Sequence, residues 1–146
     1  MGQEPMKLTI AAKAYGYTGE ELGRRLESMG LVCEFADPDY LVLMLSPENG
    51  MVALEKLENA LLSIAKRNPI EAAMPTMEKP RQVLPMGDAI GKPGVTLPLC
   101  QCQGRILASP TVSCPPAIPV LVCGERVDPD AISVMEYYGI TELDVL

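Results

Sequence analysis

The distribution of prolines divides this chain into two parts, which we expect to form different kinds of secondary structure. Three of the 14 prolines precede Asn68, and the other eleven lie from Pro69 onward. Because proline fixes φ and removes a backbone donor, it interrupts helices and central strands. Long regular elements are therefore confined to the first part. We predict two domains, residues 1–68 and 83–146, joined by a linker over residues 69–82.

Three short apolar runs in the first part are predicted strands, at residues 7–11, 31–36 and 40–45. The third is nearly all apolar, which is typical of a central strand. Two predicted helices alternate with these runs, so the order is strand, helix, strand, strand, helix. Helices packed on a small, mostly antiparallel sheet make a two-layer α/β unit.

Both helices carry start and stop signals. Thr18 and Glu21 have the spacing of an N-terminal capping box, and Gly30 is a C-terminal glycine. Ser46-Pro47 is expected to start the second helix, which should end at Asn68-Pro69. Apolar residues at steps of three and four should face the sheet: Leu54, Leu57, Leu61 and Ile64.

The second part is predicted to be Pro-rich and mixed, so the whole chain is α+β. A helix over residues 129–138 has Asp128 as its expected cap, Ile132 and Met135 facing inward, and Gly139 at its end. Shorter elements are expected as a helical turn at 86–90, strands at 97–103, 120–122 and 140–146, and a strand or short helix at 104–108.

Charge and composition exclude several functions. The net charge of -7 and the absence of a basic cluster disfavour nucleic-acid binding. The apolar runs are shorter than a membrane span and the N-terminus lacks a signal pattern, so we expect a cytoplasmic protein that binds no membrane. The chain has no histidine, which removes Ser-His and Cys-His nucleophile pairs and most zinc sites.

Two separated motifs point to a family. Gly-Arg-Ile-Leu-Ala at residues 104–108 precedes Pro-Pro-Ala-Ile-Pro-Val-Leu-Val-Cys-Gly-Glu at residues 115–125. This arrangement resembles the C-terminal domain of the bacterial ornithine/lysine/arginine decarboxylases, fold-type I enzymes that use pyridoxal phosphate. Three earlier segments are similar to the small domain that follows the large domain in those enzymes: residues 7–10, 15–19 and 30–37.

Four positions depart from the family's pattern. Ser109 stands in place of a Glu, Cys114 of a Tyr, Ala117 of a Gly, and Cys123 of a Pro. Altered specificity or activity would follow if the Glu and Tyr shape a pocket mouth or subunit contact. The candidate interface or pocket-rim residues are Arg105, Ser109, Cys114 and Glu125. Arg105 and Glu125 are expected to form an ion pair.

The resemblance implies decarboxylase chemistry that lies outside this chain. Such a lyase needs a lysine bound to the cofactor, an aspartate on the pyridine nitrogen and a phosphate-binding cup. In the family these groups belong to the large domain, and its Ser-x-His-Lys segment has no counterpart here. We therefore expect no catalytic, cofactor-binding or metal-binding residue in this fragment.

The resemblance also implies a role for the fragment. It would close one side of the active-site cleft and support oligomer contacts. Its partners would be its own pyridoxal-phosphate-binding large domain, further copies of the parent enzyme in a homo-oligomer, and a basic amino-acid substrate.

Two alternatives stay open. A free-standing, non-catalytic regulatory or binding module of polyamine metabolism would have its natural start at Met1, whereas a fragment implies a longer reading frame. Cys100, Cys102, Cys114 and Cys123 would supply four thiolates to zinc. Only one residue separates the first pair, however, and in a strand both would face the same side as core residues.

Overall fold

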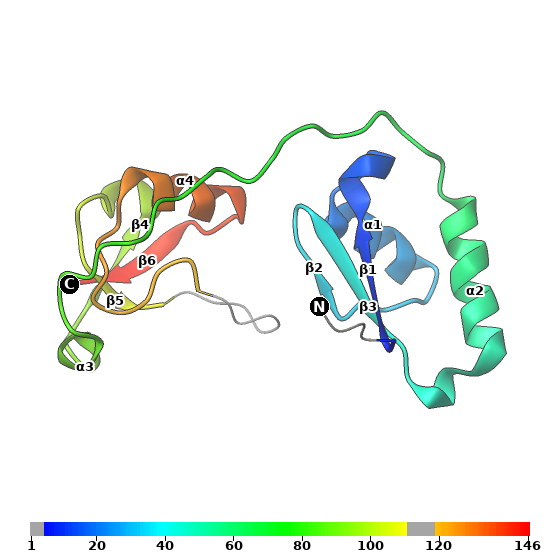
Figure 1. The fold of residues 1–146 in the computed structure, drawn as a ribbon, viewed down its shortest axis with the longest axis horizontal. Helices are drawn as coiled ribbons and strands as arrows, with labels where there is room; N and C mark the ends of the chain where they lie inside the picture. The colour runs from blue at the N-terminus through cyan, green and yellow to red at the C-terminus, as the bar shows by residue number, and fades with distance from the viewer. Residues whose placement is uncertain (1–4, 111–118) are drawn as a thin grey trace. The chain divides into compact units, whose positions relative to one another are not determined.

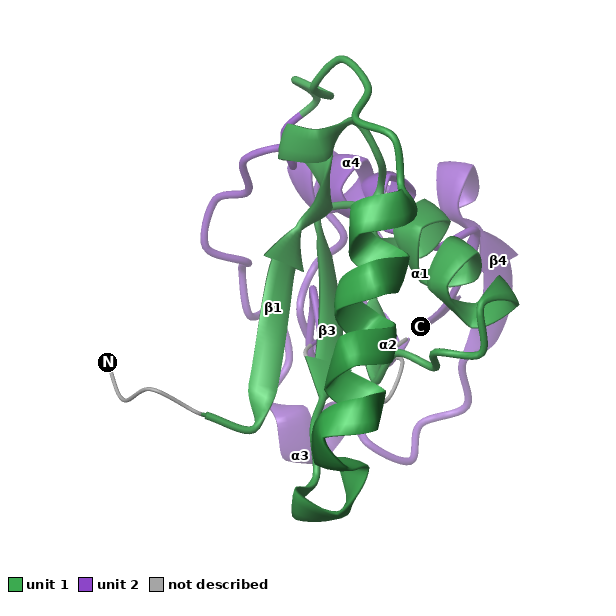
Figure 2. Ribbon diagram, turned by 90° about the vertical axis from the view of Figure 1, so that its right-hand side faces the viewer, with its two compact units in different colours: residues 1–72 green, residues 73–146 purple. Residues whose placement is uncertain are grey.

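The computed structural model describes residues 5–110 and 119–146. The chain divides into two compact units, Met1–Ala72 and Ala73–Leu146 (Figure 2). Each unit contains a three-stranded antiparallel sheet with helices, which confirms the α+β class. Residues 73–82 of the expected linker are part of the second unit. Within the described residues, no helix combines the length and the apolar character needed to cross a membrane.

The sheet of the first unit has the order β1-β3-β2 (Figure 1). Its strands are β1 (Lys7–Ala11), β2 (Phe35–Ala36) and β3 (Tyr40–Met44). The central position predicted for the third strand is confirmed. The strand expected over 31–36 keeps only two residues, because the Leu31 amide turns back to the Leu26 carbonyl at the end of the preceding helix.

The helical elements of the first unit are η1 (Ala12–Tyr15), α1 (Gly19–Ser28), η2 (Pro47–Asn49) and α2 (Gly50–Ser63). The Thr18 hydroxyl caps α1 by accepting a hydrogen bond from the Glu21 amide at 3.1 Å, as predicted. The Glu21 carboxylate does not complete a capping box, because it accepts a hydrogen bond from Arg67. Ser46 forms a capping box with Asn49 at the start of η2.

Helix α2 ends at Ser63, earlier than the predicted end at Asn68-Pro69. The following residues bond to η1 and its surroundings instead of continuing the helix. The Arg67 amide donates to the Tyr15 carbonyl at 3.1 Å, and the Ile70 amide donates to the Lys13 carbonyl at 3.0 Å. These tertiary hydrogen bonds satisfy the same backbone groups that a longer helix would use.

The core of the first unit lies between the sheet and its two long helices. Leu41 and Leu43 of β3 are buried, whereas Tyr40 and Met44 are exposed on the other face. The helix residues in this core are Leu22, Leu26, Leu57 and Ala60, and Ile64 joins them from the position directly after α2. The predicted apolar stripe of α2 is thus correct at Leu57 and Ile64, Leu61 is partly buried, and Leu54 is exposed.

The sheet of the second unit has the order β4-β6-β5, so the last strand in sequence is the central one. Its strands are β4 (Val95–Pro98), β5 (Leu107–Ser109) and β6 (Glu142–Val145). The helical elements are α3 (Met86–Ala89), η3 (Leu99–Gln101) and α4 (Pro129–Tyr137). Met135 of α4 is buried and Ile132 packs against the same core, as predicted.

Three local predictions for the second unit were wrong. Residues 120–122 form no strand, although Leu121 is buried. Residues 99–101 form η3 instead of continuing β4, so Cys100 is exposed and Cys102 buried rather than facing one side. Asp128 occupies the N-cap position of α4 without capping it, because its carboxylate binds Arg126.

Candidate functional site

The two sequence motifs of the second unit lie side by side as antiparallel backbone segments. The Leu107 amide donates to the Glu125 carbonyl at 2.8 Å, and the Val127 amide donates to the Arg105 carbonyl at 2.9 Å. An isolated bridge joins Ile106 and Arg126 between these bonds. The described parts of the two motifs, 104–108 and 119–125, therefore belong to one structural unit.

A third segment, residues 81–84, extends this pairing on the side away from Leu107. The Arg126 amide donates to the Arg81 carbonyl at 3.0 Å, and the Gly124 carbonyl accepts hydrogen bonds from Val83 and Leu84. Gly124 has a φ of 86°, and a Cβ there would lie 2.2 Å from the Leu84 carbonyl oxygen. The glycine of the second motif is thus required by the close approach of the third segment.

Glu125 has a different partner from the one predicted. Its Oε2 accepts a hydrogen bond from the Val122 amide at 2.7 Å, which holds the turn before it. Within residues 5–110 and 119–146, no ion pair joins Glu125 to Arg105. The side chain of Arg105 is exposed. The expected Arg105–Glu125 ion pair is therefore not formed, although the backbones of the two residues lie in paired segments.

Of the other positions singled out from the sequence, the structure describes Ser109 and Cys123. Ser109 is exposed at the end of β5, opposite Asp144 of β6. The Asp144 carboxylate already accepts a hydrogen bond from Thr96 at 2.7 Å. Cys123 is buried. Cys114 and Ala117 lie outside the described residues.

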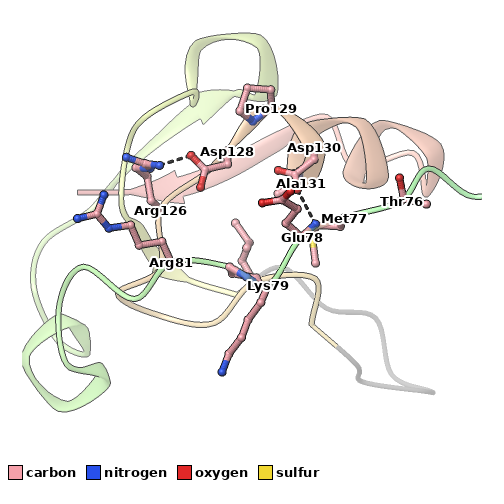
Figure 3. A pocket seen from close by; sticks show the side chains of 12 residues that line it. Thr76, Met77, Glu78, Lys79, Arg81, Arg126, Asp128, Pro129, Asp130 and Ala131 are labelled. Carbon is pink, nitrogen blue, oxygen red and sulfur yellow. Dashed lines mark hydrogen bonds and ion pairs between the residues drawn. The ribbon is translucent and has the colours of Figure 1, made fainter.

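A groove of the second unit, with a volume of about 700 Å³, lies beside the paired motifs (Figure 3). One wall is the extended segment 76–81, the other is the start of α4 over 126–131, and Leu121 contributes an apolar side chain. The Glu78 amide donates to Asp130 Oδ2 at 2.7 Å and joins the two walls. This hydrogen bond is the main reason that the pKa of Asp130 is lowered from its ordinary value.

The groove carries charges of both signs. Arg126 Nε lies 2.7 Å from Asp128 Oδ1, and Arg81 lies on the neighbouring backbone segment. Asp128 and Asp130 stand at the N-terminal end of α4. The sequence did not indicate these residues, because charged residues in a Pro-rich segment look the same as those of a solvated linker. The wall formed by residues 76–81 falls entirely in the predicted linker, residues 69–82, and the other wall comes from residues 126–131 at the start of α4.

Pyridoxal phosphate does not suit this groove. A phosphate group at the start of α4 would meet the carboxylates of Asp128 and Asp130, and the first of these already neutralises Arg126. Lys79 is the lysine of the groove, and its side chain points away from both carboxylates in Figure 3.

The cysteines of the described residues are free thiols in separate environments. Cys102 Sγ donates to the Pro98 carbonyl at 3.2 Å, and burial raises the pKa of this thiol. Cys100 is exposed and Cys123 is buried. Across the described ranges, with 111–118 left aside, no three His, Cys, Asp or Glu side chains are grouped as metal ligands.

The fold of the chain is similar to that of solved lysine decarboxylases. The lysine decarboxylase LdcF of Francisella novicida has a TM-score of 0.68 at 12% identity, over 99% of this chain and 31% of that protein's chain. The constitutive lysine decarboxylase of E. coli has a TM-score of 0.60 at 16% identity, over 98% of this chain and 31% of its own. At these identities the likeness establishes the fold.

The sequence identifies the family. Residues 70–143 match the family described as Orn/Lys/Arg decarboxylase, C-terminal domain, and the chain belongs to this family. The arginine decarboxylase of Bacillus subtilis (strain 168) is 28% identical over an alignment of 139 residues, and the match covers 89% of this chain and 28% of that relative. The chain thus spans less than a third of the length of these relatives.

Proposed function

We propose that this chain is the C-terminal portion of a pyridoxal-phosphate-dependent decarboxylase of a basic amino acid and has no activity by itself. The family match over residues 70–143, in a chain that spans 28% of a related arginine decarboxylase, carries this proposal. Two further observations support it. The sequence has no counterpart of the family's Ser-x-His-Lys segment, and the groove beside α4 does not suit the cofactor.

In this proposal the cofactor and the catalytic lysine belong to the large domain of the longer polypeptide. The present chain closes one side of the active-site cleft, so that water is excluded when the substrate is bound. The hydrogen bonds between the two paired motifs fix the backbone of the second unit in this region. Glu125 contributes by holding the Val122 amide, which is a structural role.

Arg105 and Ser109 are the described candidates for a subunit contact or pocket rim. Both side chains are exposed, and they lie at either end of the segment that pairs with Glu125 and β6. An exposed guanidinium is well suited to a carboxylate on a neighbouring subunit, because the two groups form paired hydrogen bonds. Cys114 belongs to the same proposal on the basis of its place in the motif.

A cofactor titration tests the function. The 146-residue chain alone should show no absorbance from cofactor bound covalently to lysine and should release no carbon dioxide from lysine, ornithine or arginine. The longer polypeptide encoded in the same reading frame should do both. Covalent cofactor binding and decarboxylation by the short chain would refute the proposal. An in-frame stop codon just before Met1 would instead favour a free-standing module.

A further inference from the structure

The sheet of the first unit has one covered face and one uncovered face. Helices α1 and α2 pack against the face that carries Leu41 and Leu43, which are 0% and 4% exposed. The alternate residues of β3 point away from these helices, because side chains alternate along a strand. Tyr40 and Met44 on that opposite face are 48% and 60% exposed.

The uncovered face is a continuous, largely apolar surface. Val42 at its centre lies opposite Thr9 of β1 and Phe35 of β2, so one row crosses all three strands. Ala11 lies opposite Tyr40 in a second row, and Lys7 lies opposite Met44 in a third. The ammonium of Lys7 is 3.5 Å from the Glu34 carboxylate, so its charge is partly neutralised.

The second unit provides a comparison within the same chain. The outward row of its sheet is polar, since Thr96 lies opposite Asp144 and the two side chains are hydrogen-bonded at 2.7 Å. Glu142 lies on the same face, opposite Pro98. A polar face of this kind is stable when it is exposed to solvent. The apolar sheet face of the first unit therefore indicates a surface that is covered in the complete protein.

We propose that the uncovered face, formed by Lys7, Thr9, Ala11, Phe35, Tyr40, Val42 and Met44, is the surface that docks on the large domain of the longer polypeptide. The inference rests on the proposed function and specifies where the two parts meet. About two thirds or more of the relatives' length lies outside this chain, since the chain spans 28% to 31% of them. The docking surface of the large domain is apolar and poor in charge, to match this face.

Helix α2 supplies a control surface in the same unit. Met51 and Val52 are 69% and 81% exposed on this helix. They are followed by Glu55, Glu58 and Asn59, which are also exposed, so apolar and polar side chains are mixed there. Scattered exposed apolar residues of this kind are normal for a solvated surface. Met51 therefore serves as the matched reference for Met44.

Hydroxyl-radical footprinting tests the docking surface. In the 146-residue chain, Met44 and Met51 should be oxidised at similar rates, because their exposed fractions are 60% and 69%. In the longer polypeptide, the oxidation of Met44, Tyr40 and Phe35 should slow severalfold while that of Met51 is unchanged. Equal rates for Met44 in both proteins would overturn the docking surface. Protection of Met44 already in the short chain would also overturn it, in favour of the second unit.

A pair of substitutions gives a second measurement. Met44→Lys should lower the melting temperature of the longer polypeptide and leave that of the 146-residue chain unchanged, whereas Met51→Lys should change neither. Equal effects of the two substitutions would count against the surface. A longer polypeptide that binds cofactor and decarboxylates its substrate without protecting Met44 would overturn this inference alone. A longer polypeptide without activity would overturn the proposed function.

Discussion

The Glu78 amide and the Asp130 carboxylate, 52 residues apart in sequence, form a 2.7 Å hydrogen bond across the groove of the second unit. The Asp130 Oδ1 atom also accepts from the Ala131 amide at 2.9 Å. Asp130 therefore holds the extended segment 76–81 against the start of α4. This segment lies in what the sequence alone presents as a linker.

Asp130→Asn should loosen the segment 76–81. A neutral amide accepts a weaker hydrogen bond than a carboxylate, so the Glu78 amide should lose protection from hydrogen exchange. Because the pKa of Asp130 is lowered on folding, its contribution is present above the usual carboxyl pKa and is lost as the pH falls through the lower, folded value. Acidification of the unsubstituted protein should therefore also reduce the hydrogen-exchange protection of the Glu78 amide. The control is Asp88→Asn, at an exposed position of α3. An equal loss of protection of the Glu78 amide in the control variant would contradict the role of Asp130.

Tyr17→Phe should destabilise the first unit by about 1–2 kcal/mol, because it leaves a carbonyl without its partner. The Tyr17 side chain is 1% exposed, and its hydroxyl donates to the Ala65 carbonyl at 2.8 Å. Urea unfolding measures the change. Tyr15→Phe is the matched control, since Tyr15 is 40% exposed, and it should change stability by less than about 0.5 kcal/mol. Equal losses of stability in the two variants would show that the hydrogen bond of the Tyr17 hydroxyl does not stabilise the first unit.

Gly124→Ala should lower the free energy of unfolding by about 3 kcal/mol or more, because the added side chain meets both a positive φ and a steric clash. The added Cβ would lie 2.2 Å from the Leu84 carbonyl oxygen. Gly139 also has a positive φ, of 72°, but no atom lies within 4 Å of an added Cβ. Gly139→Ala should therefore cost only about 1 kcal/mol, the backbone penalty alone. Thermal unfolding of both variants checks the difference, and similar melting temperatures would contradict it.

Alkylation should separate Cys100 from Cys102 at neutral pH. Burial raises the pKa of Cys102, so less of this thiol is in the reactive thiolate form, and its Sγ is also inaccessible. Iodoacetamide should modify the exposed Cys100 first, as read by mass spectrometry of the peptides. Both should react in denaturant, which is the control. Rapid labelling of Cys102 in the folded protein would mean that η3 opens readily.

Local signals in the sequence predicted the features that depend on neighbouring residues. Thr18 and Gly30 mark the ends of α1 because a cap needs only the adjacent turn. The apolar run at Tyr40–Met44 identified the central strand of the first sheet. The likeness to the decarboxylase family was also visible, because its motifs keep their order in the sequence.

Two of the features that were missed depend on residues far apart in sequence, and the third depends on a local contact between a side chain and the backbone. The end of α2 is set by hydrogen bonds from Arg67 and Ile70 to η1, which no periodicity reveals. The partner of Glu125 is a backbone amide, and side-chain chemistry alone suggested Arg105 instead. The groove has walls from residues 76–81 and 126–131, so neither wall carries a recognisable pattern by itself.

The position of β6 has a consequence for biosynthesis. Both β4 and β5 pair with Glu142–Val145, and both are translated before it. During translation the second sheet cannot form until these residues have been synthesised. Its two outer strands therefore emerge from the ribosome before the strand with which they pair. A nonsense codon at or before Glu142 would remove the strand that joins them, and the product would expose two unpaired edges to aggregation.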